Sequence, residues 1–395
     1  MSRNLTILTL AAGLLVSACS SSQATATASD SPAPDSPRPA FTSLPAESPP
    51  RGAESEFTTD FSKHSVSYSE ILSGGPPKDG IPAIDNPKFQ STNEADEWLN
   101  DREPVVFVQA NDEAKAYPIQ ILMWHEIVND TVGGKPLMVS FCPLCNTAIA
   151  FKRTFNGTVL DFGTTGRLRY SNLIMYDRQT ETWWQQATGD AIAGEHTGAQ
   201  LEFYPAAMIA WADFKAQHPS GTVLSRDTGF SHDYGRNPYF GYDDINQTPF
   251  LFDGSTPDQF PPMARVLTVD LNNTAVAYPY DVLRDTNIIN DVVGNAEIVV
   301  FWAEGTASAL DTNNISDGQE VGAAVAYSRL LDDQTLEFEF KDGKIFDTQT
   351  GSEWNIFGQA VAGELAGKQL APVVSINHFW FSWAAFRPET RIYQP

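Results

Sequence analysis

Two cysteines separated by two residues form the most reactive pattern in this sequence. Residues 139–152 read V-S-F-C-P-L-C-N-T-A-I-A-F-K, which places Cys142 and Cys145 between an apolar run and an alternating run. The one further cysteine, Cys19, lies in an N-terminal segment with a different expected role. We therefore expect any thiol chemistry of the mature protein to be centred on Cys142 and Cys145.

A C-P-x-C pair supports three kinds of chemistry, and the residues alone leave all three open. In a redox site, one thiolate attacks a disulfide or an oxidised sulfur, and the other cysteine resolves the intermediate. The substrate would then be an extracytoplasmic protein or a small sulfur-containing molecule. In a structural site within a non-enzymatic binding module, a disulfide closes a loop of four residues and contributes only about 2 kcal/mol.

A metal site is the third alternative. Two thiolates suit copper or zinc, but they supply only half of a tetrahedral site. His125 and His196 are the candidates to complete it, and His125 is also a candidate catalytic residue of the redox site. The sequence has no C-x-x-C-H haem motif, no phosphate-binding loop and no strand-linked G-x-G-x-x-G. Whether the protein is an enzyme depends on which alternative holds.

A second cluster able to do chemistry begins at residue 163. Four residues, G-T-T-G, are followed closely by Arg167 and Arg169. Such a segment can turn its backbone amides toward an anion, with arginines beside them to bind a carboxylate. This predicts a substrate clamp, and the alternative is a hairpin in which the arginines pair with Asp161 or Asp177.

Residues 1–18 are expected to be a signal peptide. Arg3 supplies a basic start, and Leu5 to Val16 form an apolar run too short to span a membrane. The run ends in L-V-S-A-C, which resembles the lipobox of bacterial lipoproteins and implies acylation of Cys19 and anchoring in membrane lipid. The predicted location is extracytoplasmic, in the cell envelope, and the serine after Cys19 favours the outer membrane in a host that has one.

The composition excludes some partners. Residues 19–55 are rich in Ser, Pro, Ala and Thr, which predicts a disordered tether behind the lipidated cysteine. The whole chain carries a formal net charge of -24, with a sequence pI near 4.5. Such an acidic protein is not expected to bind nucleic acid or to dock electrostatically on an anionic lipid surface.

The rest of the chain contains an internal repeat. Residues 116–130 match residues 277–291 at a constant separation of 161 residues, which is 278 minus 117 for the two tyrosines. We predict an α+β fold of two tandem, related, β-rich halves, at residues 56–223 and 262–392. An aromatic and acidic segment, residues 224–261, connects them and is expected to pack over the first half and shield the cysteines.

The second copy serves as an internal control for the first. At the same separation of 161 residues, the reactive side chains of the first copy are replaced in the second: Cys142 by Ala303, Cys145 by Thr306, His125 by Thr286 and Glu126 by Asn287. A later shift of 169 residues, which aligns two A-G-E triplets, replaces His196 by Leu365. This pattern predicts one working site in the first half and a degenerate second half.

The expected elements of the first half position the cysteines. Residues 104–109 alternate like a strand, and residues 114–116 begin its return strand. A short amphipathic helix is predicted after Pro118, and residues 137–141 are predicted as the buried strand that delivers the cysteines. Residues 148–162 are typical of a hairpin, and residues 204–218 of a closing helix.

Four motifs together resemble a known bacterial family. They are C-P-L-C-N-T-A-I-A-F, the G-T-T-G-R-L segment, N-L-I-M-Y-D-R and T-W-W-Q, in this order within residues 100–245. The chain is identified by them as similar to the family known as domain of unknown function 3179. The name implies no activity, and the resemblance to members that are selenoproteins favours the redox alternative.

Overall fold

A computed structural model describes residues 43–395, and they are mostly β, with 40% strand and 12% helix. The prediction of an α+β fold of two repeat halves is wrong, because the chain forms many small sheets. The predicted closing helix at residues 204–218 illustrates the reason. Its first part forms strand β15 (Ala207–Ala210) against β3 (Pro104–Ala110), and only α4 (Trp211–Gln217) is helical. Pairing with a distant strand thus overrides the local helical pattern.

The N-terminal part contains two sheets, and the second one carries Cys142 at the end of a strand. The first has the order β15-β3-β4-β16-β2, with β4 at Glu113–Pro118, β16 at Thr222–Leu224 and β2 at Phe89–Ser91. The second has the order β14-β7-β6-β5, with bounds Phe203–Tyr204, Thr147–Lys152, Lys135–Cys142 and Ile127–Val132. Helix α3 (Ile119–His125) joins β4 to β5 and is buried on nearly every side.

A third sheet lies beside the cysteines and carries the G-T-T-G segment. Its order is β1-β10-β11-β12-β13, with bounds Ile71–Ser73, Phe162–Arg169, Asn172–Asp177, Trp183–Gln185 and Ala191–Ala193. The predicted turn at residues 163–166 is instead part of β10, where the register shifts in a bulge between Thr164 and Arg167. Gly166 has φ +70, and a Cβ there would meet the Pro76 carbonyl oxygen at 2.0 Å, so this position requires glycine.

The C-terminal part contributes three further sheets. One has the order β28-β17-β18-β29, with bounds Ser375–Phe379, Arg265–Leu271, Thr274–Pro279 and Arg391–Ile392. Another is β19-β20-β21, at Ile288–Val293, Ala296–Ala303 and Ala323–Ser328. The third is β24-β25-β26-β27, at Phe338–Lys341, Lys344–Asp347, Glu353–Trp354 and Ala360–Ala362. Helices α5 (Tyr280–Thr286) and α6 (Trp380–Ala384) follow β18 and β28.

Short elements complete the described chain. They are α1 (Ala53–Glu56), α2 (Thr92–Ala95), the β8–β9 pair (Thr154–Phe155, Thr158–Val159), the β22–β23 pair (Leu330–Leu331, Gln334–Thr335) and three 3₁₀ helices at Tyr68–Glu70, Pro143–Cys145 and Ile315–Asp317. None of the helices within residues 43–395 is long and apolar enough to span a membrane. The predicted signal peptide and the lipidation site at Cys19 lie outside the described residues.

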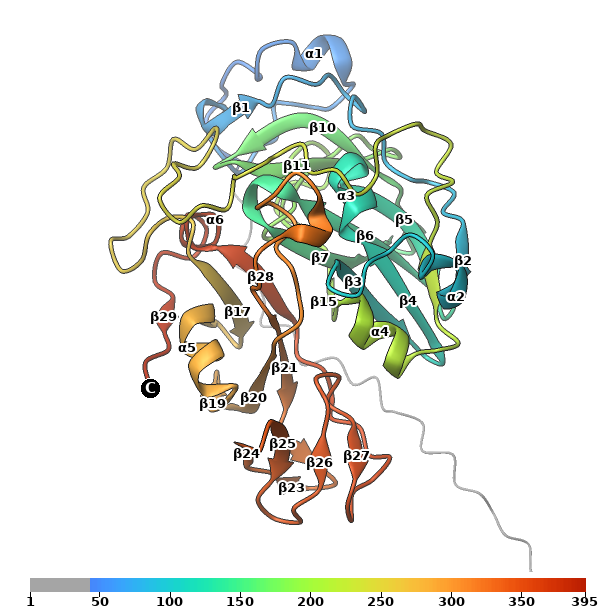
Figure 1. The fold of residues 1–395 in the computed structure, drawn as a ribbon. Coiled ribbons are helices and arrows are strands. Elements are labelled where there is room, and N and C mark those ends of the chain that lie inside the picture. Colours follow the sequence, from blue (N-terminus) through green and yellow to red (C-terminus); the bar gives the residue numbers. More distant parts are fainter. Residues whose placement is uncertain (1–42) are drawn as a thin grey trace, which may run out of the picture. The chain divides into compact units, whose positions relative to one another are not determined.

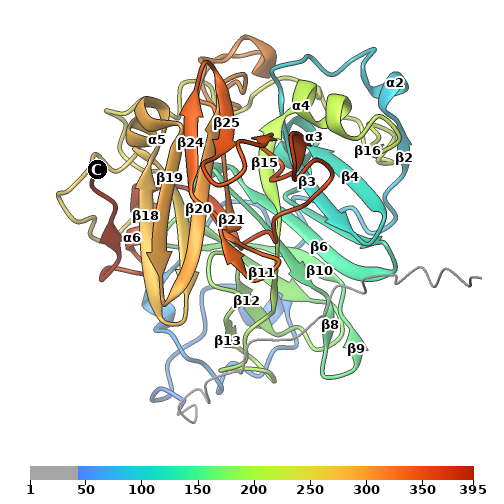
Figure 2. The same cartoon turned by 90° about the horizontal axis from the view of Figure 1, so that it is seen from below.

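The hydrophobic core does not divide at the predicted boundary between halves. One cluster joins Val139 and Cys142 with Leu310 and Phe381, and a second joins Trp211 with Phe301. Strand β28 lies beside β7, as Figure 1 shows, and β21 lies beside β15, as Figures 1 and 2 show. The C-terminal part therefore belongs to the core around the cysteines.

Candidate functional site

A tight turn at residues 142–146, here called the cysteine turn, presents both sulfurs on the same side. Strand β6 ends at Cys142, Pro143 begins a one-turn 3₁₀ helix, and Asn146 takes φ +50 to send the chain into β7. Proline suits a helix start and asparagine tolerates this left-handed conformation, so the local sequence encodes the turn. The thiols are free, are 2% and 0% exposed, and both donate to the carbonyl oxygen of Ser171, at 3.8 Å and 3.5 Å.

The residue after that shared acceptor donates to one of the sulfurs. Asn172 Nδ2 lies 3.5 Å from Cys145 Sγ and also donates to Gln186 Oε1 at 2.7 Å. Its Oδ1 accepts from Gln185 Nε2 at 2.6 Å and from the Ala187 amide at 2.9 Å, which determines the orientation of the side-chain amide. Asn172 therefore directs an N–H at Cys145, and hydrogen bonding of this kind stabilises a thiolate.

A buried glutamate is hydrogen-bonded through its backbone to Phe141, the residue before the other cysteine. Glu126 follows α3 with φ +57 and is 8% exposed, and its side chain makes no hydrogen bond or ion pair within residues 43–395. Burial raises the pKa of this carboxyl to about 8. Burial also raises the pKa of the Cys142 thiol well above its usual range, and the neighbouring Cys145 and Glu126 add to that effect.

The middle of the connecting segment packs against the hydrophobic cluster that contains both thiols. Residues 235–252, here called the cover segment, bring half-buried Tyr239 and Tyr242 against the cluster that contains both cysteines. Backbone hydrogen bonds from Gly241 to Asp311 (2.7 Å) and from Tyr242 to Leu310 (3.1 Å) hold it to a loop of the C-terminal part.

The cover segment is also attached to the shared thiol acceptor. The hydroxyl of Ser171 donates to the Phe250 carbonyl oxygen at 2.6 Å, and the Phe250 amide donates to the Tyr242 hydroxyl at 3.1 Å. Burial raises the pKa of the Tyr242 hydroxyl above its usual range, with a smaller contribution from the cysteines. Access to the sulfurs therefore requires movement at or beside this segment.

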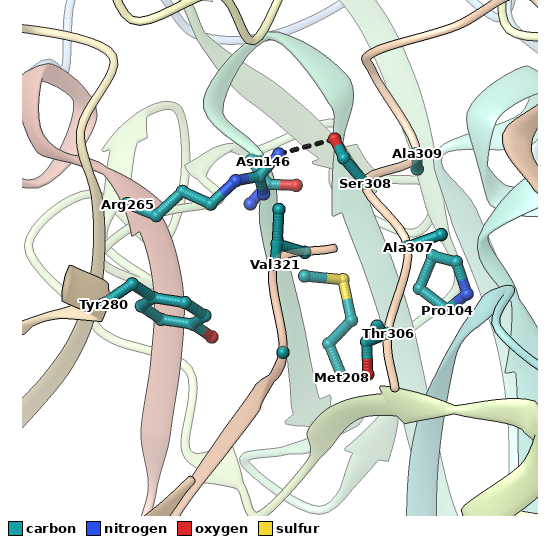
Figure 3. Close-up of a pocket in the computed structure, with 11 residues that line it drawn as sticks. Pro104, Asn146, Met208, Arg265, Tyr280, Thr306, Ala307, Ser308, Ala309 and Val321 are labelled. Carbon is teal, nitrogen blue, oxygen red and sulfur yellow. Dashed lines mark hydrogen bonds between the residues drawn. The ribbon is translucent and has the colours of Figure 1, made fainter. Parts of the chain in front are cut away.

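A buried ion pair fastens the base of the cover segment. Arg265 donates to Asp243 Oδ2 at 2.7 Å and to Ser308 Oγ at 2.6 Å, the bond drawn in Figure 3. These side chains adjoin a cavity of about 10 Å³ that Asn146, the last residue of the cysteine turn, also lines. A larger cavity of about 960 Å³ shares the wall formed by Arg265 and Tyr280. The two cavities thus have Arg265 and Tyr280 in common, and Asn146 lines the small one.

The structure does not bring the predicted histidines to the cysteines. His125 donates from Nδ1 to the Pro82 carbonyl oxygen at 2.7 Å, and its Nε2 accepts from the Tyr234 hydroxyl at 2.7 Å. The ring of His196 packs against Phe155 and Trp184. Within residues 43–395, no three or more His, Cys, Asp and Glu side chains are grouped so that they could hold a metal ion. The donors expected for copper or zinc therefore do not converge.

The two predicted substrate-binding arginines have partners that the sequence analysis did not name. Arg167 pairs with Glu56 at 3.0 Å, and Arg169 pairs with Glu70 at 2.6 Å. Neither pairs with Asp161 or Asp177. Because both side chains are engaged by carboxylates from the N-terminal segment, and because residues 163–166 belong to a bulged strand, the arrangement is a structural one.

A histidine from the C-terminal part contacts Thr147, the residue that follows the cysteine turn. His378 Nδ1 lies 2.9 Å from Thr147 Oγ1, which in turn donates to the Cys145 carbonyl oxygen at 3.1 Å. Full burial lowers the pKa of His378 to about 3, so the ring is neutral and donates from Nδ1. The contact joins residues 231 positions apart, and no local pattern in the sequence indicates it.

Sequence comparison confirms the predicted family. The profile of the family described as "Protein of unknown function (DUF3179)" matches residues 78–390, well beyond the four motifs that first suggested it. No curated protein and no solved structure matches the chain.

Proposed function

Because the chain belongs to the DUF3179 family, whose description names no activity, we propose its function from the geometry of the cysteine turn: it is a thiol–disulfide oxidoreductase. One observation carries the proposal. Two free thiols at C-P-x-C spacing share a single carbonyl acceptor and are enclosed with a side-chain amide and an unpaired carboxyl. These are groups that a dithiol needs in order to lose protons and react.

The reaction exchanges two electrons between dithiol and disulfide. The thiolate of one cysteine attacks a sulfur of the substrate disulfide, the substrate S–S bond breaks, and the leaving thiolate takes up a proton. The second cysteine then attacks the mixed disulfide and releases the second substrate thiol. The two sulfurs are not near disulfide distance in the structure, so the turn must first move to bring them together. The protein then ends with a Cys142–Cys145 disulfide, and an external dithiol reductant must restore it.

The alternatives have less support. A structural disulfide would close four residues and contribute only about 2 kcal/mol, and it would give no role to the donor on Asn172 or to the unpaired Glu126 carboxyl. A copper or zinc site would need further ligands, and His125 and His196 are engaged elsewhere. The redox alternative gives a role to the Asn172 donor beside Cys145 and to the unpaired Glu126 carboxyl.

The proposal includes a location. The lipobox-like sequence before Cys19 supports an acylated, extracytoplasmic protein anchored in the cell envelope. Disulfides persist in such compartments, so the substrate would be an oxidised extracytoplasmic protein or a small disulfide. The acidic chain favours a neutral or cationic substrate.

Redox titration of residues 20–395, purified without chelator, tests the proposal. We expect two reactive thiols that convert to one disulfide at a potential above about −300 mV, the value below which structural disulfides typically lie. Metal analysis of the same sample provides the control. Stoichiometric copper or zinc with both thiols reduced would favour the metal alternative, and a disulfide that resists mild reductants would favour the structural one.

A further inference from the structure

Glu126 occupies a backbone position that does not suit glutamate. It follows α3 with φ +57, a left-handed conformation that asparagine and glycine tolerate far better than residues with longer side chains. Asn287, 161 positions later, follows α5 in the same conformation, with φ +60. The first copy therefore has glutamate where the second has the residue that the backbone favours.

The surroundings of the Glu126 carboxyl do not stabilise its charge. It is buried and makes no hydrogen bond or ion pair with the described residues 43–395. Burial is the main cause that raises the pKa values of the Cys142 thiol and the Tyr239 hydroxyl, and the Glu126 carboxyl raises both further. Burying a carboxylate without a partner reduces the free energy of unfolding, so Glu126 does not stabilise the fold through pairing.

The backbone of Glu126 is hydrogen-bonded to strand β6, which ends at Cys142. Its carbonyl oxygen accepts from the Phe141 amide at 2.8 Å, one residue before Cys142. This bond holds the Glu126 position beside the end of β6. The opposite sulfur, on Cys145, has a different neighbour, the Asn172 amide. The two thiols therefore differ: Cys142 follows the residue that is bonded to the Glu126 backbone, and the Cys145 sulfur accepts from the Asn172 amide.

Resting on the proposed thiol–disulfide function, we propose that the Glu126 carboxyl accepts the proton of the Cys142 thiol when the site opens to substrate, which makes Cys142 the attacking cysteine. The Cys142 thiolate forms a bond to one substrate sulfur, the substrate S–S bond breaks, and Glu126 returns the proton to the leaving thiolate. Cys145, with its thiolate stabilised by Asn172, then attacks Cys142 Sγ. The second substrate thiolate leaves with the proton that Cys145 loses.

The pH dependence of disulfide reduction tests this role. Reduced protein, residues 20–395, is mixed with 2,2′-dithiodipyridine, and thiopyridone release is followed between pH 6 and pH 10. Because the carboxyl must be ionised to accept a proton and burial raises its pKa to about 8, the wild-type rate should rise with pH through about 8. Glu126→Gln should lose this rise and react about 100-fold more slowly at pH 8.

Three further variants separate a catalytic role from a structural one. Glu126→Asn, which matches the second copy and suits the backbone, should lose the same rise, whereas Glu126→Asp should retain it at a reduced rate. Glu195→Gln, at an exposed glutamate of the same part of the chain, should behave as wild type. In Cys145→Ser, the mixed disulfide should accumulate on Cys142, as identified by mass spectrometry.

The outcomes distinguish this inference from the function on which it rests. Failure of the wild type to reduce the probe at any pH would overturn the proposed function. Reduction by the wild type with an unchanged pH profile in Glu126→Gln and Glu126→Asn would overturn the role of Glu126 alone. A mixed disulfide trapped on Cys145 in Cys142→Ser, but none on Cys142 in Cys145→Ser, would reverse the assignment of the attacking cysteine.

Discussion

Buried cations in this protein are held by carboxylates, in contrast to the unpaired Glu126. Lys115 Nζ lies 3.2 Å and 3.0 Å from the two carboxylate oxygens of Asp130, and the Tyr117 hydroxyl donates to the same carboxylate at 2.6 Å. The Lys115 and Asp130 side chains are 7% and 8% exposed. Removing one partner of such a pair leaves a buried charge without compensation.

We therefore predict that Lys115→Met destabilises the protein strongly. The free energy of unfolding, measured by urea denaturation, should fall by about 3 kcal/mol, because Asp130 loses its cation while it stays buried. Lys88→Met is the matched control, since the Lys88–Asp227 pair has side chains that are 61% and 67% exposed. That variant should lose less than about 1 kcal/mol. Equal losses in the two variants would contradict the prediction.

At the scale of elements, we expect the cover segment, which packs against the cluster that contains the thiols, to limit access to them. Its attachment depends on Asp243, whose side chain is 1% exposed and accepts from Arg265 at 2.7 Å and from Gln319 at 3.2 Å. The next residue, Asp244, is exposed, and among residues 43–395 its carboxylate accepts hydrogen bonds from Asn246 alone. Asp243 thus bonds the cover segment to Arg265 and Gln319, whereas Asp244 bonds to a residue within the segment.

This difference gives a matched test of the cover segment. Asp243→Asn leaves Arg265 buried without a carboxylate, which should favour opening of the segment and speed alkylation of the cysteines by iodoacetamide at least about tenfold. Asp244→Asn should alkylate at the wild-type rate. Mass spectrometry of the intact protein counts the labelled thiols. If both variants match the wild type, the thiols become accessible by a route that does not involve release of this segment.

At the scale of the whole molecule, the N-terminal and C-terminal parts share their cores. Leu310 and Phe381 belong to the same cluster as Cys142, and Phe301 belongs to that of Trp211. The ring of His378 adds a polar contact to the cysteine turn through Thr147. Neither part can unfold without exposing apolar surface of the other, so the described chain should behave as one cooperative unit.

Unfolding should accordingly show one transition. In urea, the exposure of Cys142 and Cys145 to a thiol reagent and the change in tryptophan fluorescence should have the same midpoint, because both probes report loss of the shared core. The measurement uses reduced protein, residues 20–395, so that disulfide formation does not perturb the transition. Two separated midpoints would instead indicate parts that fold independently.

The local sequence was sufficient for the features that neighbouring residues encode. The cysteine turn follows from a proline at a helix start and an asparagine in a left-handed conformation, and the strand that delivers it follows from its apolar run. The two copies also differ at position 126, where Glu126 corresponds to Asn287, although the predicted functional residue was His125. Family membership rested on four ordered motifs and proved correct over a longer range.

Only the tertiary structure decided which side chains meet at the thiols. The backbone of Glu126 is bonded to Phe141 beside Cys142, while His125 is bonded to Pro82 and Tyr234. The partners of Arg167 and Arg169 are Glu56 and Glu70, which lie near the start of the predicted first half and far from the arginines in the chain. The fold class depended on strand pairing in the same way. Such contacts join residues far apart in the chain, and the periodicity of a short segment carries no information about them.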